Sequence, residues 1–244
     1  AADAGADAVK FQTYKADSIT LDCDGEDFII GEGPWKGQTL FQLYEDSAMD
    51  WSWHKALISE ARVQGLDFIS SAFDARAVDE LVDAGVDAIK IASFEVTDHP
   101  LIDYASRAGL PLILSTGTAT KDEITEAVRV ARGGTENFSL LHCVSAYPAK
   151  ASDYRILNIP DMSKDYGVTI GLSDHTLGYG VASGAVALGA SVFEKHFTID
   201  NSSGGSDDFF SATPESLKTY IETITESWES ISGPSFDRTE AEQY

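Results

Sequence analysis

The feature of this chain that most constrains its fold is a regular alternation of short apolar runs with amphipathic segments. The runs are continuously apolar rather than alternating, which is typical of strands covered on both faces. We expect seven strands, at residues 8–14, 67–73, 88–93, 111–116, 138–144, 169–174 and 191–198. Helices are expected between them, at residues 53–64, 75–84, 100–108, 121–132, 156–166 and 177–188. This order predicts a parallel sheet built from βα units.

Glycines mark the expected ends of the helices. At six junctions a glycine and an apolar residue stand directly before the next strand. These glycines are Gly5, Gly65, Gly85, Gly109, Gly167 and Gly189. Glycine tolerates the left-handed backbone that closes many helices, so the junctions support the same βα reading.

A barrel fits this pattern better than an open doubly wound sheet. The chain has 244 residues, and a (β/α)8 barrel needs about 250. No glycine-rich dinucleotide motif follows any of the strands. The pattern contains seven strands rather than eight, and residues 1–6 resemble the end of a helix. We therefore predict an α/β fold, a TIM (β/α)8-type barrel that lacks its first strand.

Two segments depart from the regular spacing. Residues 15–50 form a long connection that we expect to cover a substrate. Three tryptophans in or just after it are expected to anchor it or to form a wall against a sugar substituent; they are Trp35, Trp51 and Trp53. A last helix is expected at 214–230, so the barrel domain spans 1–230. Residues 231–244 are expected to be a linker toward a further domain outside this sequence.

Charge and composition exclude several classes of partner. Forty acidic residues against seventeen Lys and Arg give a net charge of -23, which argues against binding to nucleic acid or an anionic membrane. No apolar run approaches the length of a membrane span, and the two cysteines do not suggest a disulfide framework. We expect a cytoplasmic protein. Its acidity fits either a halophilic surface or an ordinary enzyme kept soluble by charge.

Polar side chains gather at the carboxyl ends of the expected strands, where barrel enzymes carry their reactive groups. In chain order they are Lys10, Gln12, Tyr14, Ser70, Ser71, Asp74, Lys90, Ser93, Glu95, Ser115, Thr116, Gly117, His142, Ser145, Tyr147, Ser173, Asp174, His175, Glu194, Lys195 and His196. Two further histidines, His54 and His99, stand at helix starts and are expected to be surface or capping residues.

Two histidines indicate a metal site. His175 and His196 end neighbouring strands, so their rings can reach one point above the barrel. Without a thiolate nearby, the ion would be Mn, Mg, Co or Zn, completed by water or by Asp207 or Glu194. The alternative is a pair of hydrogen-bonded histidines in a polar pocket.

Two lysines lie among apolar strand residues. An unpaired ammonium group is costly there, so Lys10 and Lys90 need an anionic partner. Glu95 is the nearby protein carboxylate, and a substrate phosphate or carboxylate is the alternative that we favour. A Schiff-base aldolase remains a rival, because a buried lysine also begins imine chemistry.

Six ordered motifs together resemble the sialic acid synthase (NeuB-like) family over nearly the whole chain. They are Lys10-Phe11-Gln12-Thr13-Tyr14, Lys90-Ile91-Ala92-Ser93-Phe94-Glu95, Leu114-Ser115-Thr116-Gly117, Leu141-His142-Cys143 with Ser145-Ala146-Tyr147-Pro148, Gly171-Leu172-Ser173-Asp174-His175-Thr176 and Glu194-Lys195-His196-Phe197-Thr198. Three further segments look closer to the pseudaminic acid synthase branch: the stretch 34–40, Leu43-Tyr44 and Trp51-Ser52-Trp53-His54.

The resemblance implies a metal-dependent condensation of phosphoenolpyruvate with an open-chain 2,4-diacetamido-trideoxy hexose, giving a nonulosonic acid and phosphate. N-acetylneuraminate or legionaminate synthesis is the alternative within the family. Manganese or magnesium is implied, with cobalt as a further candidate, and His175 and His196 as ligands. The catalytic residues would be Glu95, Lys90 and Tyr147. Substrate-binding residues would be Lys10, Gln12, Ser71, Ser93, Ser115, Ser145, Ser173 and Asp207.

Several departures from the family pattern matter. Ser70-Ser71-Ala72-Phe73 replaces Ser-Thr-Pro-Phe, and Gly205-Ser206-Asp207 replaces Gly-Pro-Asp. The family's first strand, with its glutamate, is not in the sequence, nor is the antifreeze-like domain that delivers an arginine across a homodimer. The chain by itself is therefore expected to be nearly inactive. A non-catalytic sugar-phosphate binding protein is the remaining alternative.

Overall fold

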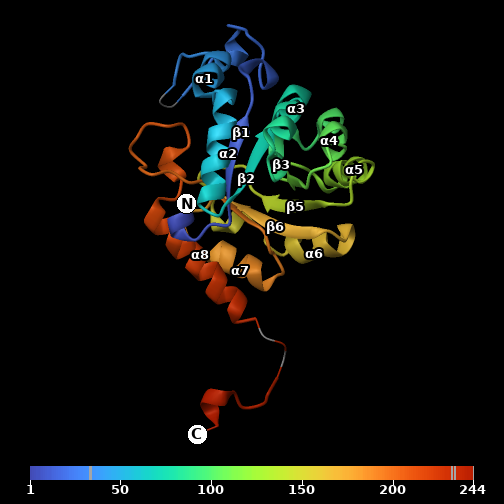
Figure 1. Ribbon diagram of the computed structural model, residues 1–244, viewed down its shortest axis with the longest axis vertical. Helices are drawn as coiled ribbons and strands as arrows, with labels where there is room; N and C mark the ends of the chain where they lie inside the picture. The colour runs from blue at the N-terminus through green and yellow to red at the C-terminus, as the bar shows by residue number, and fades with distance from the viewer. Residues whose placement is uncertain (33–34, 232, 234, 244) are drawn as a thin grey trace.

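The computed structural model describes residues 1–32, 35–231, 233 and 235–243 (Figure 1). Its centre is a seven-stranded sheet in which sequential strands are neighbours and every pair is parallel. The strands are β1 (Ala8–Thr13), β2 (Asp67–Ala72), β3 (Ala88–Ile91), β4 (Leu112–Ser115), β5 (Phe138–Cys143), β6 (Thr169–Asp174) and β7 (Phe193–Lys195). All seven predicted strands are therefore present.

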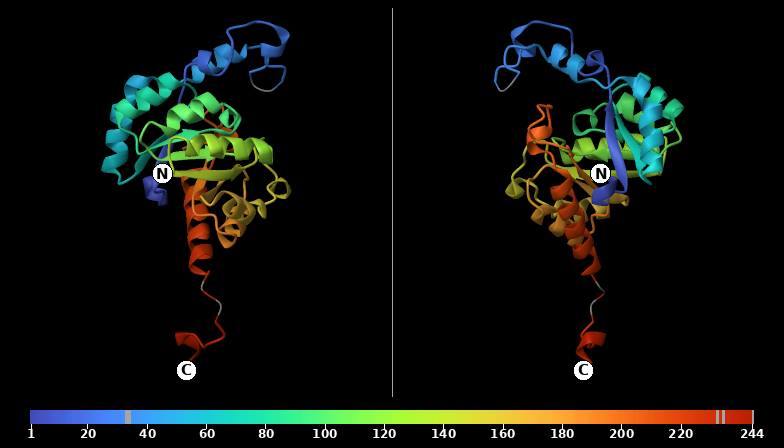
Figure 2. Two further views of the ribbon diagram at one scale, coloured as in Figure 1. Left: turned by 90° about the vertical axis from the view of Figure 1, so that its right-hand side faces the viewer. Right: turned by 60° about the vertical axis from the view of Figure 1, so that its left-hand side comes forward.

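Helices cover the outer side of the curled sheet (Figures 1 and 2). They are α2 (His54–Val63), α3 (Ala75–Ala84), α4 (His99–Ser106), α5 (Lys121–Arg132), α6 (Asn158–Tyr166), α7 (Gly180–Ala187) and α8 (Pro214–Glu229), while α1 (Leu40–Ser47) lies beyond the end of the barrel. Seven of them match predicted helices. The eighth, α1, lies inside the long connection and was not predicted.

The glycine junctions adopt the expected left-handed backbone. All six predicted positions have positive φ, from 62° at Gly167 to 96° at Gly189. Gly85 shows the arrangement most completely, because it ends α3 and its N–H donates to the carbonyls of Leu81 and Val82. A side chain at such positions would be strained, which explains why glycine recurs there.

The sheet curls but does not close. In the part of the chain that the structure describes, β1 and β7 are its two edges and do not pair with each other. A short 3-10 helix, η1 (Ala2–Ala4), packs against α8, where Ala4, Leu217 and Ile221 share a small apolar cluster. The predicted fold is confirmed as a TIM-like barrel missing one strand.

The apolar core lies between the strands and the surrounding helices. Phe68 and Ile89 from the strands and Leu81 and Ile102 from the helices are fully buried. Because these side chains hold the strands in place from outside, the carboxyl ends of the strands are free to carry polar residues.

After α8, the segment 235–243 carries one short 3-10 helix, Glu240–Glu242 (Figure 1). Residues 232, 234 and 244 of the predicted linker lie outside the described residues, as does Pro34 of the 34–40 stretch. The domain boundary at 230 and the further domain stay predictions. Among the described residues, no helix combines the length and the apolar character needed to cross a membrane.

Candidate active site

A cavity of about 980 Å³ runs along the gap between β1 and β7 and reaches Ile69, Ile113 and Leu141 inside the barrel. Lys10, Gln12, Glu194, His196 and Asp207 contribute to its wall. All five residues were named as candidates to bind substrate or metal, so the structure brings them together as the sequence indicated.

Glu194 lies between the two predicted lysines. Its Oε2 is 3.5 Å from Nζ of Lys10 and 3.9 Å from Nζ of Lys90. Lys90 is 2% exposed and also donates to the Ile91 carbonyl at 3.0 Å. The sequence pointed to Glu95 as the nearby carboxylate. Among the described residues, however, Glu194 rather than Glu95 is within ion-pair distance of Lys90, because β7 and β3 face each other across the barrel.

Charges inside the barrel shift the pKa values of this trio. Burial lowers the pKa of Lys90 to about 8, although Glu194 opposes the shift. Burial alone would raise the pKa of Glu194, but Lys10, Lys90 and a Ser173 hydroxyl outweigh it and lower this pKa to about 2. At pH 7 the Lys90 side chain is therefore mainly an ammonium group and the Glu194 side chain a carboxylate.

The register between β6 and β7 places Ser173 opposite Glu194. Ser173 donates its hydroxyl hydrogen to Oε1 of Glu194 at 2.9 Å. Oγ of Ser173 also lies 3.3 Å from Nε2 of His175. The serine thus connects the lysine trio with the histidine pair.

The two predicted metal ligands do lie side by side. The ring centroids of His175 and His196 are 5.3 Å apart. Nδ1 of His175 is 2.7 Å from the Val144 carbonyl, which can only accept, so Nδ1 carries the hydrogen. Burial lowers the pKa of His175 to about 4, so the ring is neutral at pH 7 and Nε2 holds a lone pair. Since Ser173 gives its hydrogen to Glu194, this lone pair has no donor among the described residues.

Aromatic side chains surround the histidines. The Tyr147 ring is 4.3 Å from that of His175 and 5.7 Å from that of His196, and Phe210 packs against His196 at 4.9 Å. Nδ1 of His196 is 3.4 Å from Oδ2 of Asp207. The hydrogen bond to His196 lowers the pKa of Asp207. This carboxylate therefore contacts the far nitrogen of the ring and orients it.

The predicted serines lie at or near the carboxyl ends of β2, β3, β4 and β5, at the same end of the barrel. Ser93 accepts a hydrogen bond from the Gly117 N–H at 3.1 Å. A Cβ at Gly117 would lie 2.3 Å from Oγ of Ser145, so only glycine fits there. The hydroxyl of Ser115 is buried and has no hydrogen-bond partner among the described residues. Ser71 is also buried, 1% exposed. A buried hydroxyl without a partner is a place where a ligand oxygen can bind.

Glu95 has a similar unsatisfied atom. Its Oε2 is buried without a partner in the described chain, and burial raises the pKa of this carboxyl group. The pKa of the Tyr44 phenol, on α1, is raised mainly by burial and further by the nearby charge of Glu95. The Tyr44 ring lies 6.1 Å from the ring of Tyr14. The long connection therefore reaches the site. The sequence marked Tyr44 only as part of the branch motif and not as a site residue. The helix that carries it had a signal in Thr39 and Gln42, and Thr39 does cap α1.

One histidine was misplaced by the sequence reading. His54 is 1% exposed and not on the surface. Its Nε2 is 2.9 Å from the Thr13 hydroxyl, and its Nδ1 is 3.0 Å from Glu80. The first turn of α2 lies directly over β1, which buries this ring. Among the tryptophans, Trp51 donates to the Tyr14 carbonyl as an anchor would, whereas Trp53 is largely exposed.

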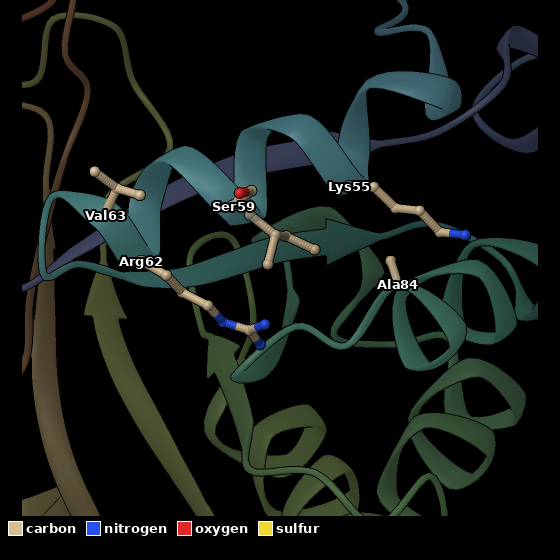
Figure 3. Close-up of a pocket in the computed structure, with 6 residues that line it drawn as sticks. Lys55, Ser59, Arg62, Val63 and Ala84 are labelled. Atoms are coloured by element: carbon tan, nitrogen blue, oxygen red, sulfur yellow. The ribbon is translucent and has the colours of Figure 1, made fainter.

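A second hollow lies between α2 and α3, on the outside of the barrel (Figure 3). Lys55, Ser59 and Arg62 of α2 line it, and Arg62 donates to the Gly85 carbonyl at 2.9 Å. It lies away from the carboxyl ends of the strands. None of the strand-end polar residues lines it, so we place the chemistry in the larger cavity.

The donor set partly fits a divalent cation. His175 offers an unshared Nε2 lone pair beside His196, and both rings are held at Nδ1 by acceptors, as in many metal-bound histidines. The described residues do not gather three His, Cys, Asp or Glu side chains in a metal-holding group. Two protein ligands are present here, and the others would come from water, substrate or further residues.

Comparison with known proteins gives the family. The sequence profile of the NeuB family matches residues 1–235. The chain belongs to the NeuB family. A pseudaminic acid synthase from Helicobacter pylori is 39% identical over 227 residues, which cover 92% of this chain and 66% of the relative. An N,N'-diacetyllegionaminic acid synthase from Legionella pneumophila is 34% identical, covering 92% and 64%. The resemblance predicted from the motifs is confirmed, including its pseudaminic branch.

A solved structure supports the NeuB fold assignment. The N-acetylneuraminic acid synthetase of Leptospira borgpetersenii superposes with a TM-score of 0.87 at 29% identity, covering 99% of this chain and 80% of that one. The chain spans about two thirds of the length of the curated NeuB relatives. In those relatives, the segment that corresponds to this chain is part of a longer protein.

Proposed function

We propose that this NeuB-family chain carries the catalytic barrel of an enzyme that condenses phosphoenolpyruvate with an open-chain acetamido hexose, giving a nonulosonic acid and phosphate. The observation that carries this proposal is the juxtaposition of the His175–His196 pair with Lys10 and the buried Lys90. Glu194 and Ser173 connect the two. Relatives that are named as synthases of pseudaminic and legionaminic acid support the reaction class.

The lysine side of the mouth would bind phosphoenolpyruvate. Lys90 and Lys10 would face its phosphate and carboxylate, since ammonium groups prefer such oxygens. The unpartnered hydroxyl of Ser115 and the neighbouring Ser93 and Ser71 would donate hydrogen bonds to the same anion. Ser173 would fix the position of Glu194, and with it the two lysines, relative to His175.

The histidine side would position the hexose aldehyde. A divalent cation held by His175 and His196 would act as a Lewis acid on the aldehyde oxygen. Tyr147 packs over both rings and would exclude water from that side. Glu95, whose pKa is raised by burial, can hold a proton near the sugar hydroxyls. Gln12 and Ser145 would bind polar groups at the rim, and Asp207 would orient His196.

The acceptor is proposed to be a 2,4-diacetamido-trideoxy hexose. Relatives named as pseudaminic acid synthases, at 35 to 39% identity, support this choice over the legionaminate alternative, at 34 to 36%. A cytoplasmic homodimer is part of the same proposal and stays a prediction.

The Schiff-base alternative fits the geometry less well. A nucleophilic lysine must be neutral, whereas Lys90 has a carboxylate at 3.9 Å and donates to a carbonyl. Borohydride with pyruvate would label Lys90 or Lys10 in an aldolase. We expect no label.

The test is phosphate release with phosphoenolpyruvate and a panel of mono- and diacetamido hexoses, with product mass as readout. It uses the natural full-length protein, with and without manganese. We expect a diacetamido hexose to give a nonulosonic acid and one phosphate per product, only with the metal. No metal-dependent phosphate release with any hexose would overturn the proposal.

A further inference from the structure

The ends of β6 and β7 carry ordered pairs of residues on both faces of the sheet. Their register pairs are Ser173 with Glu194 and Asp174 with Lys195. Successive side chains of a strand point to opposite faces. Glu194 and His196 line the cavity, with Ser173 and His175 beside them. Asp174 and Lys195 lie on the other face of the sheet, where Lys195 reaches the cavity wall next to α8.

The outward pair is a buried ion pair. Oδ2 of Asp174 is 3.3 Å from Nζ of Lys195, and the two side chains are 0% and 9% exposed. The proposed chemistry uses neither group. Lys195 also donates to the Thr176 carbonyl, and its Nζ lies 5.1 Å from the centre of the Tyr220 ring of α8. The pair therefore joins β6, β7 and α8 at the level of the histidines.

Asp174 also fixes the turn that follows His175. Its Oδ1 accepts hydrogen bonds from the backbone N–H and the hydroxyl of Thr176, each at 2.8 Å. The backbone N–H of His175 donates to the Tyr154 hydroxyl at 2.7 Å, and that hydroxyl donates to the Ser173 carbonyl at 2.9 Å. With its chain held on both sides, His175 can change its distance to His196 only if β6 moves relative to β7.

We propose that Asp174 and Lys195 are positioning residues that set the separation of the two histidines for one shared divalent cation. They touch neither cation nor substrate. Because Asp174 and Lys195 form the last register pair before the histidines, at 3.3 Å, loss of this ion pair lets the ends of β6 and β7 separate. The inference rests on the proposed metal site.

The test compares metal binding in substituted full-length protein. Asp174→Asn keeps the acceptor for Thr176 and removes the charge, whereas Lys195→Met removes the ammonium and keeps the length. Lys195→Arg keeps the charge and serves as the rescue variant. Manganese affinity is measured by calorimetry, and the visible absorption of bound cobalt reports the geometry of the ligands.

We expect Asp174→Asn and Lys195→Met to weaken manganese binding about tenfold or more and to change the cobalt spectrum, as loss of outer-shell support does elsewhere. Lys195→Arg should bind within a few-fold of wild type. Two controls separate this from instability. Ile102→Ala removes a fully buried side chain far from the site, and Asp165→Asn breaks an exposed ion pair with Lys121. Both should keep wild-type affinity and spectrum.

Two results would overturn the inference, and they can be told apart. If Asp174→Asn and Lys195→Met lower the thermal unfolding midpoint but keep wild-type manganese affinity and cobalt spectrum, the pair is only structural and the metal site stands. If wild-type protein binds neither ion, the proposed metal site fails, and the positioning role fails with it. Asp174→Asn is nearly isosteric, so the test does not depend on whether Lys195→Met folds.

Discussion

Replacing Glu194 by glutamine should move the titration of Lys90. At a separation of 3.9 Å and an effective dielectric constant of about 20, a carboxylate stabilises an ammonium group by about 4 kcal/mol. The glutamine side chain, and water that enters the site, would compensate part of this lost stabilisation. We expect a net loss of about 1.4 to 2.7 kcal/mol, which is one to two pKa units. The charged form loses its partner, so the pKa of Lys90 should fall from about 8 to roughly 6 to 7.

The assay is an NMR titration of ¹³Cε-labelled lysines in wild type and Glu194→Gln. Glu126→Gln is the matched control, because it makes the same chemical change in an exposed pair with Arg129 on α5. Binding of inorganic phosphate without metal gives a second readout. In acid, where Lys90 is charged in both proteins, the variant should bind phosphate more tightly, since its lysines are no longer paired. Between the two Lys90 pKa values this advantage should shrink, because Lys90 has lost its proton in the variant and still carries it in wild type.

This prediction has a clear refutation. If the Lys90 resonance titrates at the same pH in wild type and in Glu194→Gln, the carboxylate does not set the charge of the lysine. The resident counterion would then have to be another group, and the assignment of Glu194 as the residue joining the two halves of the site would be wrong.

Three further predictions test other parts of the reasoning. His175→Ala should abolish manganese binding measured by calorimetry, whereas His99→Ala should not; unchanged affinity in His175→Ala would remove the ligand assignment. Phosphoenolpyruvate should associate faster in stopped flow as salt screens the net charge of -23, and a steady fall in rate would contradict this. Gly85→Ala, at φ 83°, should lower the free energy of unfolding by about 1 kcal/mol in urea titrations, with Gly178→Ala, which has no such φ, as the control.

The fold was predictable because its signals are local. Each apolar run and each glycine of positive φ lies within one βα unit, so the strand order followed from the chain order. The helix α1 was missed because its eight residues lie in a connection without apolar periodicity, and its one clear signal is the Thr39 cap. His54 was misread for a related reason. Its burial depends on β1 and Glu80, which are distant in sequence.

The site was predictable as a set of residues but not as a set of contacts. Placing polar residues at strand ends brought His175 and His196 together, because neighbouring strands end near each other. The partner of Lys90 could not be found this way. Glu95 is five residues away but turns out of the strand in a 3-10 helix, whereas Glu194 reaches Lys90 from the opposite wall. Which of the two carboxylates pairs with Lys90 depends on the curvature of the barrel, and no local sequence pattern encodes this curvature.

An acidic protein can bind a trianionic substrate only if charge at the mouth differs from charge on the surface. Two lysines and Glu194 leave a net charge of +1 in the trio, and His175 is neutral at pH 7. Phosphoenolpyruvate carries roughly -3, since a phosphate group contributes up to about -2. The trio alone therefore balances only part of the substrate charge. Under the proposed function, the rest falls to the cation between the histidines, so the spacing set across β6 and β7 would affect anion binding as well as aldehyde activation.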